Sequence, residues 1–140
     1  MKKQQISLVV DAVILTVGGK NAEVLLIRRK NAPFKNKWAL PGGFVGQNEK
    51  LKKAAKRELR EETGFSARDL KEVGIFDDPK RDPRGRLVSV AYMAAVRKIN
   101  VKTMAGDDAK EAQFFSIKNL PPLAFDHKKI IKKAVKILVK

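Results

Sequence analysis

The sequence contains no cysteine and a single histidine, His127. Disulfide bonds and thiolate metal sites are therefore excluded. A bound metal ion would therefore be held by oxygen ligands or by His127, the one imidazole of the chain. For a lone histidine, however, a capping or packing role is commoner than metal binding. The absence of cysteine fits a reducing compartment, so we expect the protein in the cytoplasm.

Long apolar runs are also missing. The run at 6–17 is interrupted by Asp11, and no small-residue cleavage site follows it. We therefore expect a first strand there rather than a signal peptide, and no membrane span. With 140 residues, 44% of them apolar, the chain is long enough for one core, and we expect a single domain over 1–140.

Acidic residues are scarce compared with basic ones. The chain has 15 Asp and Glu against 31 Lys and Arg, which gives a formal net charge of +16. This excess attracts nucleotides, RNA and anionic lipid alike, and by itself selects none of them. Aromatic residues make up 6% of the chain, which is thin for a base-stacking RNA platform.

β-Branched and apolar runs alternate along the chain with glycine-rich and polar breaks. The break GGKN separates the first two runs and predicts a hairpin. One helix is expected from about Glu49 to Gly64, a glycine suited to a helix C-cap, and another from about Asp126. Strands are predicted near 6–17, 22–29, 38–40, 70–78, 86–96 and 112–117. This order indicates an α/β fold in which helices cover the faces of a sheet.

The second predicted helix is amphipathic. Its apolar stripe contains Ile130, Ile131, Ala134, Val135 and Leu138, with lysines elsewhere on the wheel. The pattern favours a helix packed on the sheet with a solvated lysine face. A basic helix lying on an anionic membrane is the alternative.

Three glutamates share one side of the first predicted helix. Glu61 and Glu62 fall within about 60° of Glu58 on a helical wheel, on the apolar side and opposite the lysines. Solvated Glu–Lys pairs would explain an ordinary charged helix, but here the close pairs repel. A divalent cation removes that repulsion, and Mg²⁺ prefers carboxylates, commonly with substrate phosphates completing its shell. The helix therefore predicts a metal site for phosphate chemistry.

The segment that contains this helix resembles the signature of the Nudix hydrolases, G-x5-E-x7-R-E-U-x-E-E-x-G-U, where U is bulky. All the fixed positions match: Gly43, Glu49, Arg57, Glu58, Leu59, Glu61, Glu62, Gly64 and Phe65. The order of strands around this box also resembles the family's α/β/α sandwich with a mixed central sheet. The resemblance implies hydrolysis of a nucleoside diphosphate linked to another moiety, by water attacking phosphorus.

The resemblance also implies residue roles. Glu58, Glu61 and Glu62 would hold Mg²⁺, with Mn²⁺ as a substitute, and Glu58 and Glu61 would be catalytic, one of them as the base contact. The implied structural residues are Glu49 pairing with Arg57, Gly43 permitting a tight turn against the site, Gly64 ending the helix, and Leu59 and Phe65 in the core.

A second acid outside the box often serves in this family. Asp107, Asp108 and Glu111, in the stretch MAGDDAKEA, are the candidates. The alternative for these residues is a polar turn between strands.

The loop FDDPKRDPRGR, 76–86, is dense in Arg, Asp and Pro. Its arginines would donate paired hydrogen bonds to phosphate or to sugar hydroxyls. The alternative is a solvated turn whose charges pair with one another. With AGDDAKEAQFF and LPPLAFDH, it resembles the subgroup of ADP-ribose pyrophosphatases, in which Pro79 or Pro83 would be a proline beyond the box. We therefore expect ADP-ribose to be split into AMP and ribose 5-phosphate, with Arg81, Arg84 and Asp108 binding it.

The end of the second strand offers two more candidates for substrate binding. Arg28 would meet a phosphate there, and an aromatic residue of the next loop, Phe34 or Trp38, would stack on adenine. The alternatives are an exposed arginine and a core position for Trp38.

Other functions share parts of these patterns. Hydrolysis of nucleoside triphosphates or dinucleoside polyphosphates would use the same box without the arginine loop. An RNA-binding or decapping protein would use the net charge, but nucleic acid is not required by the function expected here. Regulators that sense sugar nucleotides join a Nudix-like domain to a DNA-binding winged helix, for which we expect this sequence to be too short. Pairing of protomers into a homodimer is left open.

Overall fold

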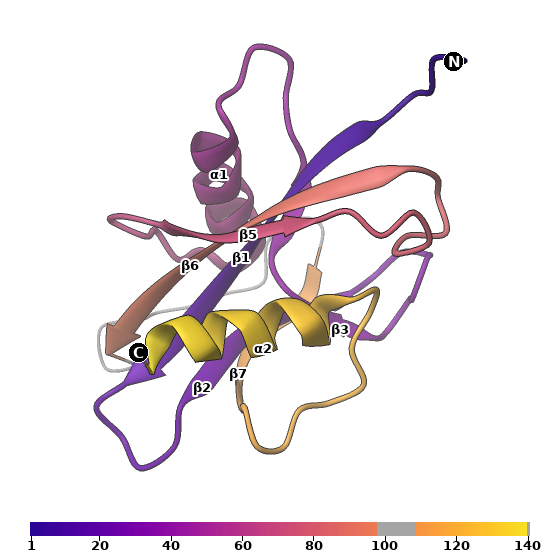
Figure 1. Cartoon of the computed structure of the whole chain (residues 1–140). Helices are drawn as coiled ribbons and strands as arrows, with labels where there is room; N and C mark the ends of the chain where they lie inside the picture. The colour runs from indigo at the N-terminus through magenta and orange to yellow at the C-terminus, as the bar shows by residue number, and fades with distance from the viewer. Residues whose placement is uncertain (98–108, 140) are drawn as a thin grey trace.

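The computed structural model describes residues 1–97 and 109–139, which form a seven-stranded sheet and two helices (Figure 1). The strands are β1 (Ser7–Val17), β2 (Glu23–Arg29), β3 (Trp38–Ala39), β4 (Gly42–Phe44), β5 (Lys71–Phe76), β6 (Leu87–Arg97) and β7 (Ala109–Ser116); the helices are α1 (Leu51–Thr63) and α2 (His127–Leu138). The main strand order is β3-β2-β1-β6-β5, while β4 also pairs with β1 and β7 with β2.

The sheet is mixed, as predicted. β1 runs parallel to β6 along its whole length, from Ser7 opposite Leu87 to Val17 opposite Arg97, and antiparallel to β2 through the predicted hairpin. Parallel neighbours need a long crossover, and here it contains α1 and β5. The α/β class is therefore confirmed.

Each face of β1 packs against a different helix. Alternate residues of a strand point to opposite faces, so Val10, Ala12 and Ile14 join one core cluster and Val13 and Leu15 the other. The first cluster includes Ala54, Ala55 and Leu59 of α1, and the second includes Ile130, Ile131 and Ala134 of α2. Figure 1 shows the strands lying between the two helices. The predicted α/β/α arrangement and the packed face of α2 are both present.

Helix α1 differs slightly from its predicted bounds. It begins at Leu51 rather than Glu49, because the Glu49 carboxylate accepts a hydrogen bond from the Gly46 amide within the preceding loop. It ends as predicted at Gly64, whose φ of 75° lets its amide close on the carbonyl of Arg60 at 2.8 Å.

Strand β4 was not predicted, because GGF lacks the apolar pattern of a strand. It pairs antiparallel with β1, with Gly43 opposite Val10. Gly42 has no room for a side chain there, because an added Cβ would collide with the Val10 carbonyl. Within the described residues, no helix is both long and apolar enough to cross a bilayer.

Candidate active site

Arg57 ties the loop after β4 to helix α1. Its Nε and Nη2 donate to the two oxygens of Glu49 at 2.7 and 3.0 Å, and Nη2 also donates to the Phe44 carbonyl at 3.1 Å. The hydrogen bond from Arg57, helped by the Gly46 amide, lowers the pKa of Glu49 to about 2. Hydrogen bonds to Glu49 likewise raise the pKa of Arg57, against the effect of burial. The pairing implied by the family resemblance is therefore present.

Glu58 and Glu62 are buried and line a cavity beside strand β4. An oxygen of Glu62 accepts the Gly42 amide at 2.7 Å. Gly43 lies so close to Glu58 that an added Cβ would stand 2.6 Å from the carboxyl carbon. Gly43 is part of an extended strand, so the reason for glycine is this close approach and not the tight turn that the resemblance implied.

Glu61 lies at the rim, with 46% of its side chain exposed, and is not among the cavity-lining residues. Arg57 Nη1 lies 2.8 Å from Glu58 Oε1 and 3.2 Å from Glu61 Oε2, so one positive charge already bridges these two carboxylates. Across residues 1–97 and 109–139, however, no three acidic, histidine or cysteine side chains are arranged to hold a metal. The donors are all hard oxygens, which suit Mg²⁺ or Mn²⁺, but Glu61 must turn from Arg57 to join the other two.

The cavity has a volume of about 440 Å³. Besides Glu58 and Glu62, its lining includes residues from β1, β2, the arginine loop and the segment before α2. Those that bear on the site are Asp11, Arg29, Gly43, Phe44, Arg57, Arg81, Asp82, Arg84, Phe125 and His127. The lining therefore combines carboxylates and arginines around a space in the size range of small-molecule sites.

Arg81 lines this cavity, but its guanidinium is used inside the protein. Its Nε and Nη2 donate to Asp126 at 2.9 and 2.8 Å, and Nη2 lies 3.9 Å from Asp11. Burial acts to lower the pKa of Arg81, but the bond to Asp126 together with the negative charges of Asp126, Asp11 and Asp82 outweighs burial, and the pKa is raised. This fork anchors the arginine loop to the start of α2, so the geometry favours an anchoring role over the substrate contact predicted for it.

Arg84 also lines the cavity, and its charge is paired within the loop, as the solvated-turn alternative expected. Nε and Nη2 donate to Asp82 at 3.1 and 2.8 Å. Burial acts to raise the pKa of Asp82, and the bonds from Arg84 outweigh that effect and lower it. The Arg84 guanidinium lies 5.3 Å from each of the ring centroids of Phe44 and Phe125.

The structure brings Arg29, and not the predicted Arg28, to the cavity. Arg28 pairs with Glu111 at 3.0 Å in a separate shallow pocket that Trp38 also lines. Arg29 donates to the Pro33 carbonyl at 2.7 Å and lies 5.1 Å above the Phe125 ring. Burial, with Arg84 nearby, lowers the pKa of Arg29. Adjacent residues of a strand point to opposite faces of the sheet, so only one of these two arginines can face the site. The sequence does not indicate which of them does.

Three other sequence candidates, Glu111, Trp38 and Phe34, fall outside the cavity lining. Glu111 pairs with Arg28 on β7, and Asp107 and Asp108 lie outside the described residues. Trp38 packs edge-on against Phe115 at 4.6 Å, as its core alternative expected. Phe34 is on the surface and contacts the edge of Phe125 at 4.8 Å.

A buried polar network under the cavity was not anticipated. His127 accepts the Leu40 amide on Nδ1 at 2.9 Å and places Nε2 3.4 Å from Asp11, which also accepts the Ser89 hydroxyl at 2.5 Å. Burial, opposed by Asp11, lowers the pKa of His127 and so favours the neutral ring. Because Nδ1 accepts the Leu40 amide, the proton of the neutral ring lies on Nε2. His127 is thus a packing residue that fixes the strand leading to Gly42. Asp11 in an apolar run was the only sequence signal of this network.

The NUDIX domain profile matches residues 7–134. The chain belongs to the Nudix family. A relative from Methanocaldococcus jannaschii, described as ADP-ribose pyrophosphatase, is 50% identical over 113 residues, covering 81% of this chain and 66% of the relative. Nudix hydrolases generally need a divalent cation.

Two further proteins are similar to this chain. The Nudix domain of Shewanella oneidensis NrtR, solved in complex with ADP ribose, has a TM-score of 0.90 at 30% identity and covers 97% of this chain and 90% of that one. The ADPR responsive transcriptional repressor NtrR of Acinetobacter baylyi is 37% identical over 128 residues, 89% of this chain and 51% of the repressor. The chain thus spans between half and two thirds of the length of the two curated relatives.

Proposed function

We propose that this Nudix chain hydrolyses ADP-ribose to AMP and ribose 5-phosphate, using Mg²⁺, for which Mn²⁺ can substitute. The observation that carries the proposal is the pair of buried carboxylates, Glu58 and Glu62, facing a cavity beside Gly43. ADP-ribose is supported by the pyrophosphatase from M. jannaschii and by the ADP ribose bound to the Shewanella domain.

In this proposal Glu58, Glu61 and Glu62 hold the metal ion, which neutralises phosphate charge and activates water when bound. Glu61 accepts the proton of the attacking water, because its half-exposed carboxylate reaches solvent at the rim. The water oxygen forms a bond to one phosphorus, the bridging P–O bond breaks, and the second phosphate leaves. Arg57 stays paired with Glu58 while Glu61 turns from it toward the metal ion, and Arg29 faces the diphosphate within the cavity.

The intact glutamates favour hydrolysis over sensing alone. A pure sensor needs to bind ADP-ribose but does not need a set of metal-binding carboxylates, and this chain keeps all three. The similarity to an ADPR responsive repressor, and to a Nudix domain solved with ADP ribose, makes binding of ADP-ribose without turnover the second candidate.

The test is to incubate the purified protein with Mg²⁺ and a panel of substrates, and to resolve the products by chromatography. The panel contains ADP-ribose, other nucleotide sugars, dinucleoside polyphosphates, nucleoside triphosphates and capped RNA. Glu61→Gln should lose at least about 100-fold in rate if Glu61 is the base. Glu72→Gln, which removes an exposed carboxylate on β5, is the matched control and should keep full activity.

Each outcome of the panel has a definite meaning. AMP formed from ADP-ribose in the wild type and lost in Glu61→Gln supports the whole proposal. Turnover of another compound would overturn the substrate and keep the glutamate site, whereas binding of ADP-ribose without turnover would favour a sensor. The cytoplasmic location stays a prediction from the sequence. The pairing of protomers into a homodimer stays open, and light scattering after gel filtration tests it.

A further inference from the structure

The segment 40–42, which leads from β3 into β4, has only two backbone amides because its middle residue is a proline. Each of the two is bonded to a side chain from another part of the molecule. The Leu40 amide donates to Nδ1 of His127 at 2.9 Å, and the Gly42 amide donates to Oε1 of Glu62 at 2.7 Å. The segment therefore links the start of α2 to a glutamate of α1.

His127 uses both of its ring nitrogens inside the protein. Nδ1 accepts the Leu40 amide, and Nε2 lies 3.4 Å from Oδ1 of Asp11, whose other oxygen accepts the Ser89 hydroxyl. All four residues are buried. Although His127 lines the cavity, its two nitrogens already have partners. Its effect on the active site therefore runs through the Leu40 backbone rather than through contact with the substrate.

We infer that His127 is a positioning residue for the metal ligand Glu62, and that it acts through the backbone of the segment 40–42. Asp11 orients the His127 ring for this contact. A buried amide without an acceptor is unfavourable, so loss of the imidazole lets the segment shift toward another partner. The Gly42 amide moves with the segment, and the Glu62 carboxylate then loses the donor that fixes its orientation. The inference rests on the proposed function for the role of Glu62 as a metal ligand.

Two polar substitutions separate this role from a packing role. Asparagine carries its carbonyl oxygen on Cγ, where histidine carries Nδ1, so His127→Asn keeps an acceptor for the Leu40 amide. Glutamine carries its oxygen one bond farther from the backbone, so His127→Gln loses that acceptor although it fills more of the space. A packing role ranks the glutamine variant above the asparagine variant, because packing depends on volume. The positioning role ranks them in the opposite order.

The experiment titrates Mn²⁺ into each purified variant and measures free Mn²⁺ by electron paramagnetic resonance, so that no turnover is needed. His127→Leu and His127→Gln should weaken Mn²⁺ binding roughly 10- to 100-fold, the loss typical of residues that orient a metal ligand. His127→Asn should stay close to the wild-type affinity. Leu138→Ala removes a partly buried side chain at the other end of α2, outside the cavity lining. It is the destabilising control and should leave Mn²⁺ binding unchanged.

Thermal unfolding of each variant reports its stability separately from Mn²⁺ binding, and if His127→Leu does not fold, the comparison of His127→Asn with His127→Gln decides. Equal Mn²⁺ affinities for these two variants would overturn the inference. Hydrolysis of ADP-ribose by the wild type, with unchanged Mn²⁺ binding in His127→Gln, would remove the positioning role alone. Weaker Mn²⁺ binding in His127→Gln but not in His127→Asn, without hydrolysis by the wild type, would keep the positioning role and remove the proposed reaction. No Mn²⁺ binding by the wild type would overturn both.

Discussion

At the scale of single residues, Gly43 is where the backbone of β4 meets the glutamate helix. A Cβ at this position would stand 2.6 Å from the Glu58 carboxyl carbon and 2.7 Å from each of its oxygens. We predict that Gly43→Ala displaces the Glu58 carboxylate and lowers the hydrolysis rate by about 100-fold, the size of effect expected for an ångström of misplacement. A steady-state assay with a Mg²⁺ titration measures the change.

Gly19→Ala is the control for that substitution, because the nearest atom to its added Cβ would be 3.9 Å away. It should leave both the rate and the Mg²⁺ dependence unchanged. A Gly43→Ala protein with full activity would show that Glu58 does not need its present position.

Some residues of the candidate site could be predicted from the sequence and others could not. The helical wheel placed Glu58 and Glu62 on one face, because residues four apart on a helix share a face, and both residues line the cavity. Of the two arginines that end β2, Arg29 and not the predicted Arg28 lines the cavity, and the pairing of β2 with β7 is irregular between them. Phe125 was not considered, because nothing in the local sequence indicates a left-handed phenylalanine.

At the scale of elements, the ion pair between Glu49 and Arg57 joins a loop to a helix. The folded-state pKa of Glu49, about 2, lies below its ordinary value of 4.5. A lowered carboxyl pKa contributes stability above its unfolded value and loses it as the pH falls toward its folded value. We predict that the Glu49–Arg57 coupling is constant from pH 7 to 5 and shrinks between about pH 4.5 and pH 2.

A double-mutant cycle measures this coupling, with Glu49→Gln, Arg57→Gln and both changes together. Urea unfolding at several pH values gives the free energy of unfolding for each protein. The cycle cancels the bonds that Arg57 makes to Glu58 and Glu61, to the extent that they are independent of Glu49. A coupling that does not change with pH would contradict the assigned ion pair.

Helices and strands whose apolar residues recur periodically could be predicted from the sequence. A strand that forms only through its backbone pairing with a distant segment could not. The hairpin of β1 and β2, the strand β6 and both helices follow from periodicity and from turn residues, whereas the parallel pairing of β6 with β1 does not. Strand β4 has two glycines in three residues, and only its pairing with β1 makes it a strand. The link from Arg81 to Asp126 spans 45 residues, a separation at which local pattern carries no information.

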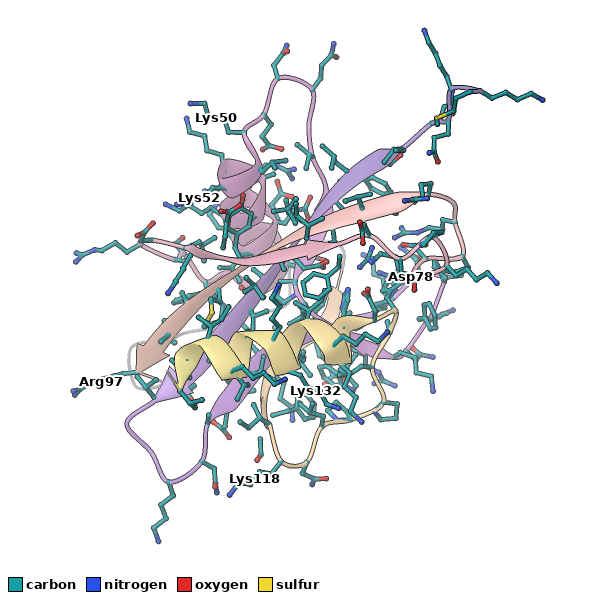
Figure 2. The ribbon with its side chains drawn as sticks, viewed as in Figure 1. Lys50, Lys52, Asp78, Arg97, Lys118 and Lys132 are labelled. Atoms are coloured by element: carbon teal, nitrogen blue, oxygen red, sulfur yellow. The ribbon has the colours of Figure 1, made fainter. Side chains whose placement is uncertain are left out.

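At the scale of the whole molecule, the charge of +16 is spread over separate surfaces. Figure 2 shows Lys50 and Lys52 at α1 and Lys132 on α2, with the sheet between them. The exposed lysines of α2 are Lys128, Lys129, Lys132, Lys133 and Lys136. None of these lysines lines the cavity of the glutamates, so the basic surface and the candidate active site are separate features.

We therefore predict that RNA binds this protein only through its phosphates. The affinity should fall steeply with salt and show no sequence preference, since the lysines present charge without a stacking platform. Replacing Lys128, Lys129 and Lys132 with Gln should reduce the slope of log affinity against log salt by roughly 0.7 per contact removed with single-stranded RNA. The same variant should hydrolyse ADP-ribose at the wild-type rate, because these lysines lie outside the cavity. Sequence-selective binding that persists at high salt, or a loss of hydrolysis in this variant, would instead make the basic surface part of the function and bring back the decapping alternative.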